Sequence, residues 1–280
     1  MRVLAMLDGT LADPTTPLIR VDDLGVTRGD GVFETILVVD GKPRELGPHL
    51  DRLDHSAAML ELPPPDRAAW ERCVQLVLDN WQGGEEMALK LVYTRGPEFG
   101  DGTPTGYAMG LPIGEKVLLA RETGVAVVTL ARGYDPAIVP AAPWLLLGAK
   151  SLSYAVNMAA LRHAESVGAS EVVFIAADGS VLEGPTSSVV LVSGRTLRTT
   201  PPSSGILKGT TQGALFRAAE QAGWSTKVEP VTEAQLREAD ALFMASSVRK
   251  LTRVHTLDGV QLPDAGTLHK ELSALYESEY

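Results

Sequence analysis

The sequence predicts an α+β protein built from two unequal domains. Runs rich in β-branched residues alternate with stretches in which apolar residues recur at helical spacing, so both strands and helices are expected. A segment crowded with Gly and Pro, 95–114, separates a smaller N-terminal part from a larger C-terminal part, and we expect it to be a long loop. The chain has 280 residues, 45% hydrophobic and 21% charged, which is an ordinary globular balance.

The N-terminal part contains two strands and two helices. Residues 32–39 read VFETILVV and end at Asp40 and Gly41, a pair typical of hairpin turns. Leucine and alanine then recur at helical spacing up to a run of three prolines that starts at Pro63, and Asp66 can cap the next helix. The expected elements are strand 32–39, helix 46–60, helix 66–81 and strand 87–94.

The C-terminal part is richer in strands. Asp178 and Gly179 predict a hairpin turn, and Thr232 with Gln235 forms a capping box before a helix. The expected elements are strands 124–132 and 144–150, a helix from 152 that stops at Gly168, hairpin 171–184, strand 187–192, helix 210–222, strands 241–247 and 251–259, and a short terminal helix. We therefore expect domains at 1–112 and 124–280, joined by a linker at 113–123.

Composition excludes several classes of function. Acidic residues number 35 against 25 basic ones, and the formal net charge of −10 disfavours a nucleic-acid partner. No apolar run approaches the ~20 residues of a membrane helix, and the first ten residues do not resemble a secretory signal. Cys73 is the only cysteine and the five histidines are scattered, so no metal site is expected. These features predict a soluble, cytoplasmic protein that binds neither membrane nor nucleic acid.

Lys150 is the residue that most suggests chemistry. It ends the apolar run WLLLGA, and burial there would favour the neutral amine that a Schiff-base lysine needs. Taken alone, a lysine in this place is more often one that extends its ammonium to solvent. Arg52, Glu183 and Ser247, each taken alone, also fit ordinary structural roles.

Together these residues lie in segments that resemble the fold-type IV pyridoxal-phosphate enzymes, the class IV aminotransferase family. The resemblance covers most of the chain, and aminodeoxychorismate lyases are the most similar members. Six segments carry it in order: RGDGVFETI (28–36), HLDRL (49–53), GAKSLSYAVNMAA (148–160), EVVFIAADGSVLEGPTSSVVLV (171–192), GILKGTTQGAL (205–215) and MASSVRKLTRVHTLDG (244–259). It implies a small N-terminal α/β domain and a larger β-rich one, with the cofactor between them.

The resemblance assigns the main cofactor contacts to three side chains. Lys150 would form the Schiff base with pyridoxal 5′-phosphate and then move the substrate proton as base and acid. Glu183 would pair with the pyridine nitrogen and keep it protonated. Arg52 would hold the cofactor phosphate through its guanidinium.

Further contacts follow from the same resemblance. The backbone amides of Ile206 and Leu207, expected at a helix start, would add donors to the phosphate. Ser247 would contribute a hydroxyl, and Tyr154 would lie near the cofactor phenolate. The family also implies a homodimer acting on a small-molecule substrate.

Two reactions remain open. A lyase would convert 4-amino-4-deoxychorismate to 4-aminobenzoate and pyruvate for folate biosynthesis, whereas an aminotransferase would act on D-amino acids or branched-chain amino acids. Thr35 stands where lyases can carry a hydroxyl, beside Phe33 as an apolar wall. Arg95 is the candidate carboxylate anchor, although the histidine of the D-amino acid enzymes is missing two residues later. The motifs favour the lyase; a cofactor-free binding relative is the remote alternative.

Overall fold

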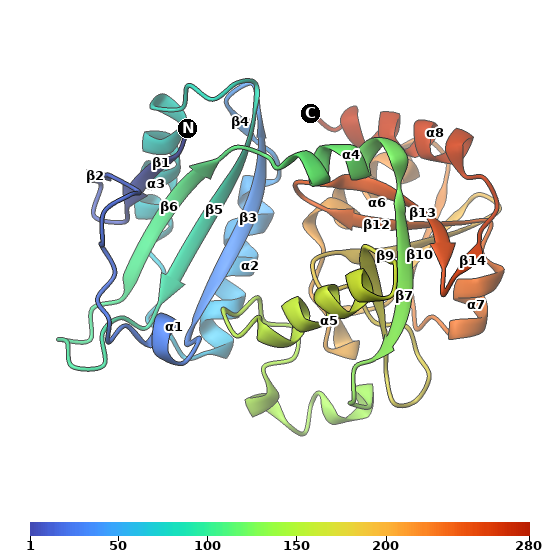
Figure 1. Ribbon diagram of the computed structural model, residues 1–280, viewed down its shortest axis with the longest axis horizontal. Helices are drawn as coiled ribbons and strands as arrows, with labels where there is room; N and C mark the ends of the chain where they lie inside the picture. The colour runs from blue at the N-terminus through green and yellow to red at the C-terminus, as the bar shows by residue number, and fades with distance from the viewer. The chain divides into compact units, whose positions relative to one another are not determined.

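The computed structural model describes residues 1–280, and the chain divides into two compact units. Unit 1 comprises Met1–Gly114 and Ala149–Tyr154, and unit 2 comprises Glu115–Gly148 and Ala155–Tyr280. Each unit contains one sheet together with helices (Figure 1), so the predicted α+β class is confirmed. All the helices are too short or too polar to cross a lipid bilayer.

Unit 1 is an antiparallel sheet with two helices on one face, α2 and α3 (Figure 1). The strand order is β2-β1-β6-β5-β3-β4. Its elements are β1 (Val3–Met6), β2 (Leu11–Ala12), α1 (Leu24–Thr27), β3 (Gly31–Val39), β4 (Lys42–Pro43), α2 (Leu46–Met59), α3 (Arg67–Asp79), β5 (Glu86–Thr94) and β6 (Thr105–Leu111).

Local sequence signals explain several of these elements. Asp40 and Gly41 both have positive φ, 49° and 73°, as a two-residue hairpin turn between β3 and β4 requires. The Asp66 side chain accepts a hydrogen bond from the amide of Ala69 and begins α3 as predicted. The predicted strands 32–39 and 87–94 and the predicted helix 46–60 are confirmed as β3, β5 and α2.

Two sequence expectations are wrong. The expected loop 95–114 contains β6. The expected linker 113–123 stays a prediction, and helix α4 (Glu115–Thr123) lies within it. The glycines of β6 obscure the alternation of apolar and polar residues that marks a strand. Gly110 avoids a close contact, because a Cβ at this position would lie 2.5 Å from Met87 Sδ. The expected strand 144–150 is instead a short 3₁₀ turn, Pro143–Leu145, and its apolar run does not enter a core: Trp144 is 74% exposed.

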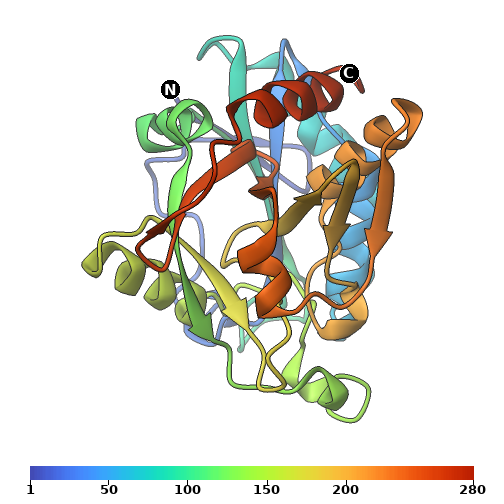
Figure 2. The ribbon, with the colours of Figure 1, turned by 90° about the vertical axis from the view of Figure 1, so that its right-hand side faces the viewer.

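Unit 2 is a larger mixed sheet in the order β11-β10-β9-β12-β13-β7-β8, with β14 paired to β13. Its elements after α4 are β7 (Val125–Ala131), α5 (Ala155–Ser166), β8 (Glu171–Ile175), β9 (Ser188–Ser193), β10 (Thr196–Thr199), α6 (Thr210–Gln221), β11 (Ser225–Val228), α7 (Glu233–Glu238), β12 (Ala241–Ser246), β13 (Lys250–Leu257), β14 (Val260–Gln261) and α8 (Gly266–Glu277). Helix α5 lies beside β7 and β8 (Figure 2), and the predicted capping box of Thr232 and Gln235 begins α7.

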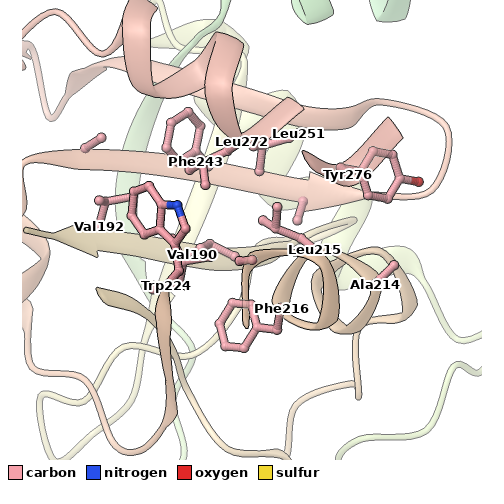
Figure 3. Close-up of a cluster of buried hydrophobic side chains, with 14 of the residues drawn as sticks. Val190, Val192, Ala214, Leu215, Phe216, Trp224, Phe243, Leu251, Leu272 and Tyr276 are labelled. Atoms are coloured by element: carbon pink, nitrogen blue, oxygen red, sulfur yellow. The ribbon is translucent and has the colours of Figure 1, made fainter. Parts of the chain in front are cut away.

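Strands β9 and β12 are buried on both faces of the unit 2 sheet. Val190 and Phe243 pack with helices α6 and α8 on one face, while Val189 and Met244 pack on the other face with the α7 side. Figure 3 shows the first cluster, in which Leu215 and Leu272 approach the strands from the two helices. This double burial explains why both strands read as unbroken apolar runs.

Replacing Phe243 by alanine should lower the free energy of unfolding of unit 2 by about 3–5 kcal/mol, because the ring is fully buried and leaves a cavity. Urea unfolding followed by circular dichroism measures the change. Val260→Ala is the control, since Val260 is 63% exposed and its loss should cost less than about 0.5 kcal/mol. Equal costs for the two variants would contradict this packing.

Candidate active site

The segment that carries Lys150 pairs with the start of β3. The amide of Phe33 donates to the carbonyl of Lys150 at 3.0 Å, and the amide of Leu152 donates to the carbonyl of Gly31 at 2.7 Å. Gly31 is required for this approach, because a Cβ there would lie 2.8 Å from Leu152 Cδ1 and 2.7 Å from the Tyr93 carbonyl oxygen. Residues 149–154 therefore belong to unit 1, although the sequence placed them in the second domain.

The Lys150 amine lies over an aromatic pair. Its Nζ is 4.5 Å from the centre of the Phe33 ring and 6.0 Å from that of Tyr154, and the two rings meet edge to face at 5.2 Å. The Lys150 amide donates to Ser56 Oγ on α2 at 3.0 Å, which fixes the backbone from the other side. Three residues singled out from the sequence, Lys150, Phe33 and Tyr154, thus lie together in a half-buried site.

Arg52 is held by a buried acid. Glu34 is fully buried on β3, and its carboxylate accepts hydrogen bonds from Arg52 Nε and Nη2, each at 2.7 Å. His49, also buried and one helical turn before Arg52 on α2, lies with Nδ1 2.7 Å from the same carboxylate. The bidentate pair fixes the plane of the guanidinium.

Burial and charge act in opposite directions on Glu34. Burial alone would raise the pKa of its carboxyl, but Arg52 and then His49 outweigh that effect and hold the pKa far below its usual range. Burial lowers the pKa of His49, with Glu34 opposing and the positive charges of Arg52 and Lys150 adding to the decrease. The imidazole is therefore neutral near pH 7, and because Glu34 is anionic, His49 Nδ1 carries the proton that it donates.

Sequence reasoning missed Glu34 and His49. The available signal was the alternation in VFETI, which places Glu34 on the same strand face as the apolar Val32 and Ile36. A carboxylate on an apolar face needs a cationic partner, and HLDRL supplies one at the helical spacing of His49 and Arg52.

The two substrate-side candidates of unit 1 differ in their surroundings. Thr35 lies two residues from Phe33 on the same face of β3 and is half-buried, as a substrate contact requires. Arg95, expected as the carboxylate anchor, instead binds Asp30 at 2.6 Å through Nε and donates to the Leu60 carbonyl at 2.7 Å. Its guanidinium therefore ties the end of β5 to neighbouring loops, and the substrate role expected for Arg95 stays a prediction.

In unit 2, Glu183 lies beside the segment that precedes α6. Its backbone pairs with Phe174 of β8, and its Oε2 accepts a hydrogen bond from the amide of Leu207 at 3.2 Å. Tyr134 lies near this carboxylate and donates to the Ser204 carbonyl at 3.0 Å. Burial and then the charge of Glu183 raise the pKa of Tyr134 to about 12, so its hydroxyl keeps its proton. Sequence reasoning missed Tyr134.

The predicted helix 210–222 is confirmed as α6, which starts at Thr210 after the N-cap Gly209. Ile206 and Leu207 lie before that start, and the first turn of α6 contains the amides of Thr210 and Thr211. The amide of Leu207 is used by Glu183 instead. Ile206 itself is buried beside β8.

Ser247 lies in the turn between β12 and β13, at the same end of the sheet as the start of α6. Ser188 connects the two: it pairs with Ala245 of β12, and a Cβ on Gly209 would lie 2.3 Å from Ser188 Oγ. The same turn carries Arg249, which forms an ion pair with the fully buried Glu171 and donates to Thr186 Oγ1 at 2.8 Å. The hydrogen bond to Thr186 links the Ser247 turn to the loop that follows Glu183.

Comparison with known proteins identifies the family. The profile of the amino-transferase class IV family matches residues 31–257, which includes Arg52, Lys150 and Glu183. The chain belongs to the amino-transferase class IV family. The predicted resemblance is thereby confirmed, and so is the expectation of an enzyme that uses pyridoxal phosphate.

Among similar class IV proteins, a bifunctional aminodeoxychorismate lyase / D-amino acid transaminase of Mycobacterium tuberculosis is 44% identical over 270 residues, 93% of each chain. The pyridoxal-phosphate-bound structure of a hypothetical aminotransferase from the same organism superposes with a TM-score of 0.96 at 42% identity, covering 100% of this chain and 98% of that one. A fold IV transaminase from Curtobacterium pusillum has a TM-score of 0.94 at 42% identity, with 99% of each chain covered.

The donor set of this class IV chain fits the cofactor. Unit 1 offers an amine over aromatic rings and a guanidinium held in one orientation by Glu34. Unit 2 offers a half-buried carboxylate, Glu183, and a helix N-terminus with hydroxyls beside it. These groups match the aldehyde, the pyridine nitrogen and the phosphate of pyridoxal phosphate.

Replacing Glu34 by glutamine should destabilise unit 1 by about 3–5 kcal/mol, because Arg52 would remain in place without its buried counter-ion. Urea unfolding measures the loss. Glu98→Gln is the matched control: its pair with Arg28 has side chains 40% and 65% exposed and should contribute at most about 1 kcal/mol. A loss as small in the Glu34 variant as in the control would refute the buried pair.

Acid should destabilise the protein through His49. Because its folded pKa is lowered, the stabilisation is complete above the ordinary value near 6.5 and declines as pH falls below it, when the unfolded chain binds a proton first. The contribution to the slope approaches about 1.4 kcal/mol per pH unit. Urea unfolding at pH 7.5, 6.5 and 5.5 should show a smaller slope for His49→Gln, whereas exposed His55→Gln should keep the wild-type slope. Equal slopes in all three proteins would exclude His49 as the source.

Proposed function

We propose that this chain is a pyridoxal-phosphate-dependent 4-amino-4-deoxychorismate lyase that releases 4-aminobenzoate and pyruvate. The observation that carries the proposal is the face of β3 that brings Phe33, Thr35 and the Lys150 amine together in unit 1. The relative named as a bifunctional lyase and D-amino acid transaminase, with 44% identity, supports the same reaction.

The residues divide the work by their chemistry. When bound, pyridoxal phosphate supplies an aldehyde that combines with the substrate amine and a ring that withdraws electrons from the carbon bearing that amine. Lys150 holds the cofactor and takes the proton from that carbon as general base. Glu183 keeps a proton at the pyridine nitrogen, and Leu207 orients the carboxylate for this role.

Each unit offers its own candidate groups for the phosphate. Arg52 supplies a guanidinium whose orientation Glu34 fixes. At the start of α6, the amides of Thr210 and Thr211 take the place first given to Ile206 and Leu207, with the Ser247 hydroxyl at the same sheet end. Tyr154 packs on Phe33 and closes the apolar wall near the amine.

Two observations favour the lyase over amino transfer. Thr35 supplies a hydroxyl at the position where lyases can carry one, on the same strand face as Phe33. Arg95, the residue that would anchor the α-carboxylate of a D-amino acid, is bound to Asp30. In the lyase reaction the ring-to-oxygen bond to the enolpyruvyl group breaks, pyruvate leaves, and the ring becomes aromatic 4-aminobenzoate.

Amino transfer with D-amino acids is the second candidate activity, and the bifunctional name of the 44% identical relative favours it. Proton removal by Lys150 is common to both reactions.

The proposal also includes a cytoplasmic location, a role in folate biosynthesis and a homodimer. Exposed apolar side chains support an interface in unit 2: Ile138, Trp144, Leu145, Val156 and Met158.

Cofactor-loaded protein incubated with aminodeoxychorismate and no keto acid should release 4-aminobenzoate and pyruvate over many turnovers. Lys150→Ala should reduce the rate by about 10²-fold or more, because it removes both the covalent anchor and the base, and it should abolish the visible absorbance of the bound cofactor. Lys42→Ala is the control, since Lys42 is exposed on β4 and should change neither.

Other outcomes discriminate among the candidates. Transfer of amino groups from D-amino acids to 2-oxoglutarate, with no 4-aminobenzoate formed, would replace the lyase with the aminotransferase. A protein that takes up pyridoxal phosphate without any visible absorbance would contradict both.

A further inference from the structure

The turn that joins β12 to β13 consists of Ser247, Val248 and Arg249. The residue that follows, Lys250, pairs with Ser246 across the two strands and has a φ of 58°. This left-handed conformation is common at the end of a three-residue hairpin loop, but glycine usually adopts it there. A lysine is retained in it only where neighbouring groups hold the turn in place.

Arg121 holds this turn from helix α4. Its Nε and Nη2 both donate to the carbonyl oxygen of Val248, at 3.0 and 2.6 Å, across 127 residues of sequence. Hydrogen bonds from a charged donor are stronger than neutral ones, and here two of them meet on one oxygen. Helix α4 packs against β13 although none of its residues is buried, so a polar contact rather than an apolar core joins the helix to the turn.

The Val248 carbonyl sets the orientation of the rest of the turn. A peptide group is planar and trans, so fixing this carbonyl toward Arg121 also directs the amide of Arg249 away from α4. The Arg249 side chain fastens the turn a second time, because it pairs with fully buried Glu171 at the start of β8. Contacts to α4 and to β8 thereby fix the backbone that carries Ser247.

Ser247 is the residue of this turn that the proposed function assigns to the cofactor phosphate. Ser188 of β9 pairs with Ala245, two residues before it. A Cβ on Gly209, the N-cap of α6, would lie 2.3 Å from Ser188 Oγ, so the turn and the start of α6 share one end of the sheet. We propose that Arg121 is a positioning residue for the phosphate, which orders the turn so that the Ser247 hydroxyl is held beside the start of α6. This inference rests on the proposed function, from which it takes the phosphate role of Ser247.

A basic residue in the last turn of a helix also interacts favourably with the helix dipole, and Arg121 occupies that place in α4. That role needs only the charge and would affect the stability of the helix. The two hydrogen bonds to Val248 predict a more specific effect. Loss of Arg121 should weaken the binding of the phosphate and spare the ring and the aldehyde, which are assigned to Glu183 and Lys150.

The test titrates the apoprotein with pyridoxal 5′-phosphate and with pyridoxal, which has the same ring and aldehyde without the phosphate. Arg121→Met should weaken pyridoxal 5′-phosphate binding about tenfold and leave the affinity for pyridoxal within about twofold, as expected for loss of a charged hydrogen bond. Unchanged pyridoxal binding also shows that the variant is folded. Arg121→Lys should restore part of the affinity, because an ammonium can donate to the same carbonyl. Arg162→Met is the matched control, since Arg162 is exposed on α5 and its loss should change neither affinity.

A double-mutant cycle separates action through the turn from direct contact with the phosphate. In a Ser247→Ala background, Arg121→Met should weaken pyridoxal 5′-phosphate binding clearly less than it does in the wild type, because the group that it positions is gone. Additive losses would overturn the inference, since Arg121 would then act on the phosphate independently of Ser247.

Three other results would overturn it: unchanged affinity of Arg121→Met for pyridoxal 5′-phosphate, an equal loss for pyridoxal, or unchanged pyridoxal 5′-phosphate affinity in Ser247→Ala alone. The lyase proposal is tested separately, because cofactor binding needs no substrate. A wild type that binds pyridoxal 5′-phosphate and forms no 4-aminobenzoate contradicts the lyase and leaves the role of Arg121 intact.

Discussion

The carboxylate of Glu34 lies fully buried between β3 and α2, and a charge in that place has to be neutralised by the protein. Arg52 neutralises this charge and the neutral His49 donates a hydrogen bond to it, both from one face of α2, which sets the rotation of the helix against the strand. The same contact fixes the plane of the Arg52 guanidinium. One buried ion pair thus determines both the packing of unit 1 and the orientation of its best candidate for a phosphate anchor.

The alternation of β3 separates structural from chemical roles. Glu34 and its apolar neighbours face α2, whereas Phe33 and Thr35 point to the opposite face, where Lys90 lies across from Thr35. The Lys150 segment pairs with the start of this strand and brings a second amine over Phe33. A shift of one residue in the register of β3 would exchange the two faces and would bury Thr35 in place of Glu34.

Unit 2 also contains an ion pair with a fully buried acid, Glu171. Arg249, in the turn after β12, forms an ion pair with buried Glu171 and donates to Thr186 in the loop after Glu183. The amide of Leu207 donates to the Glu183 carboxylate, and Tyr134 donates to the Ser204 carbonyl in the same segment before α6. These contacts rely on polar groups placed at the ends of strands whose interiors are entirely apolar.

The amino-acid sequence alone determined the α+β class, most of the strands and helices, the family and its cofactor, because these depend on local periodicity, turn residues and ordered motifs such as HLDRL and GAKSLSY. It also predicted roles for Lys150 and Glu183. Only the tertiary structure decided that residues 149–154 join unit 1, that Arg95 is bound to Asp30, and that Lys90 faces Thr35. Each of these depends on strand register or on a partner distant in sequence, and periodicity along the chain carries no information about either.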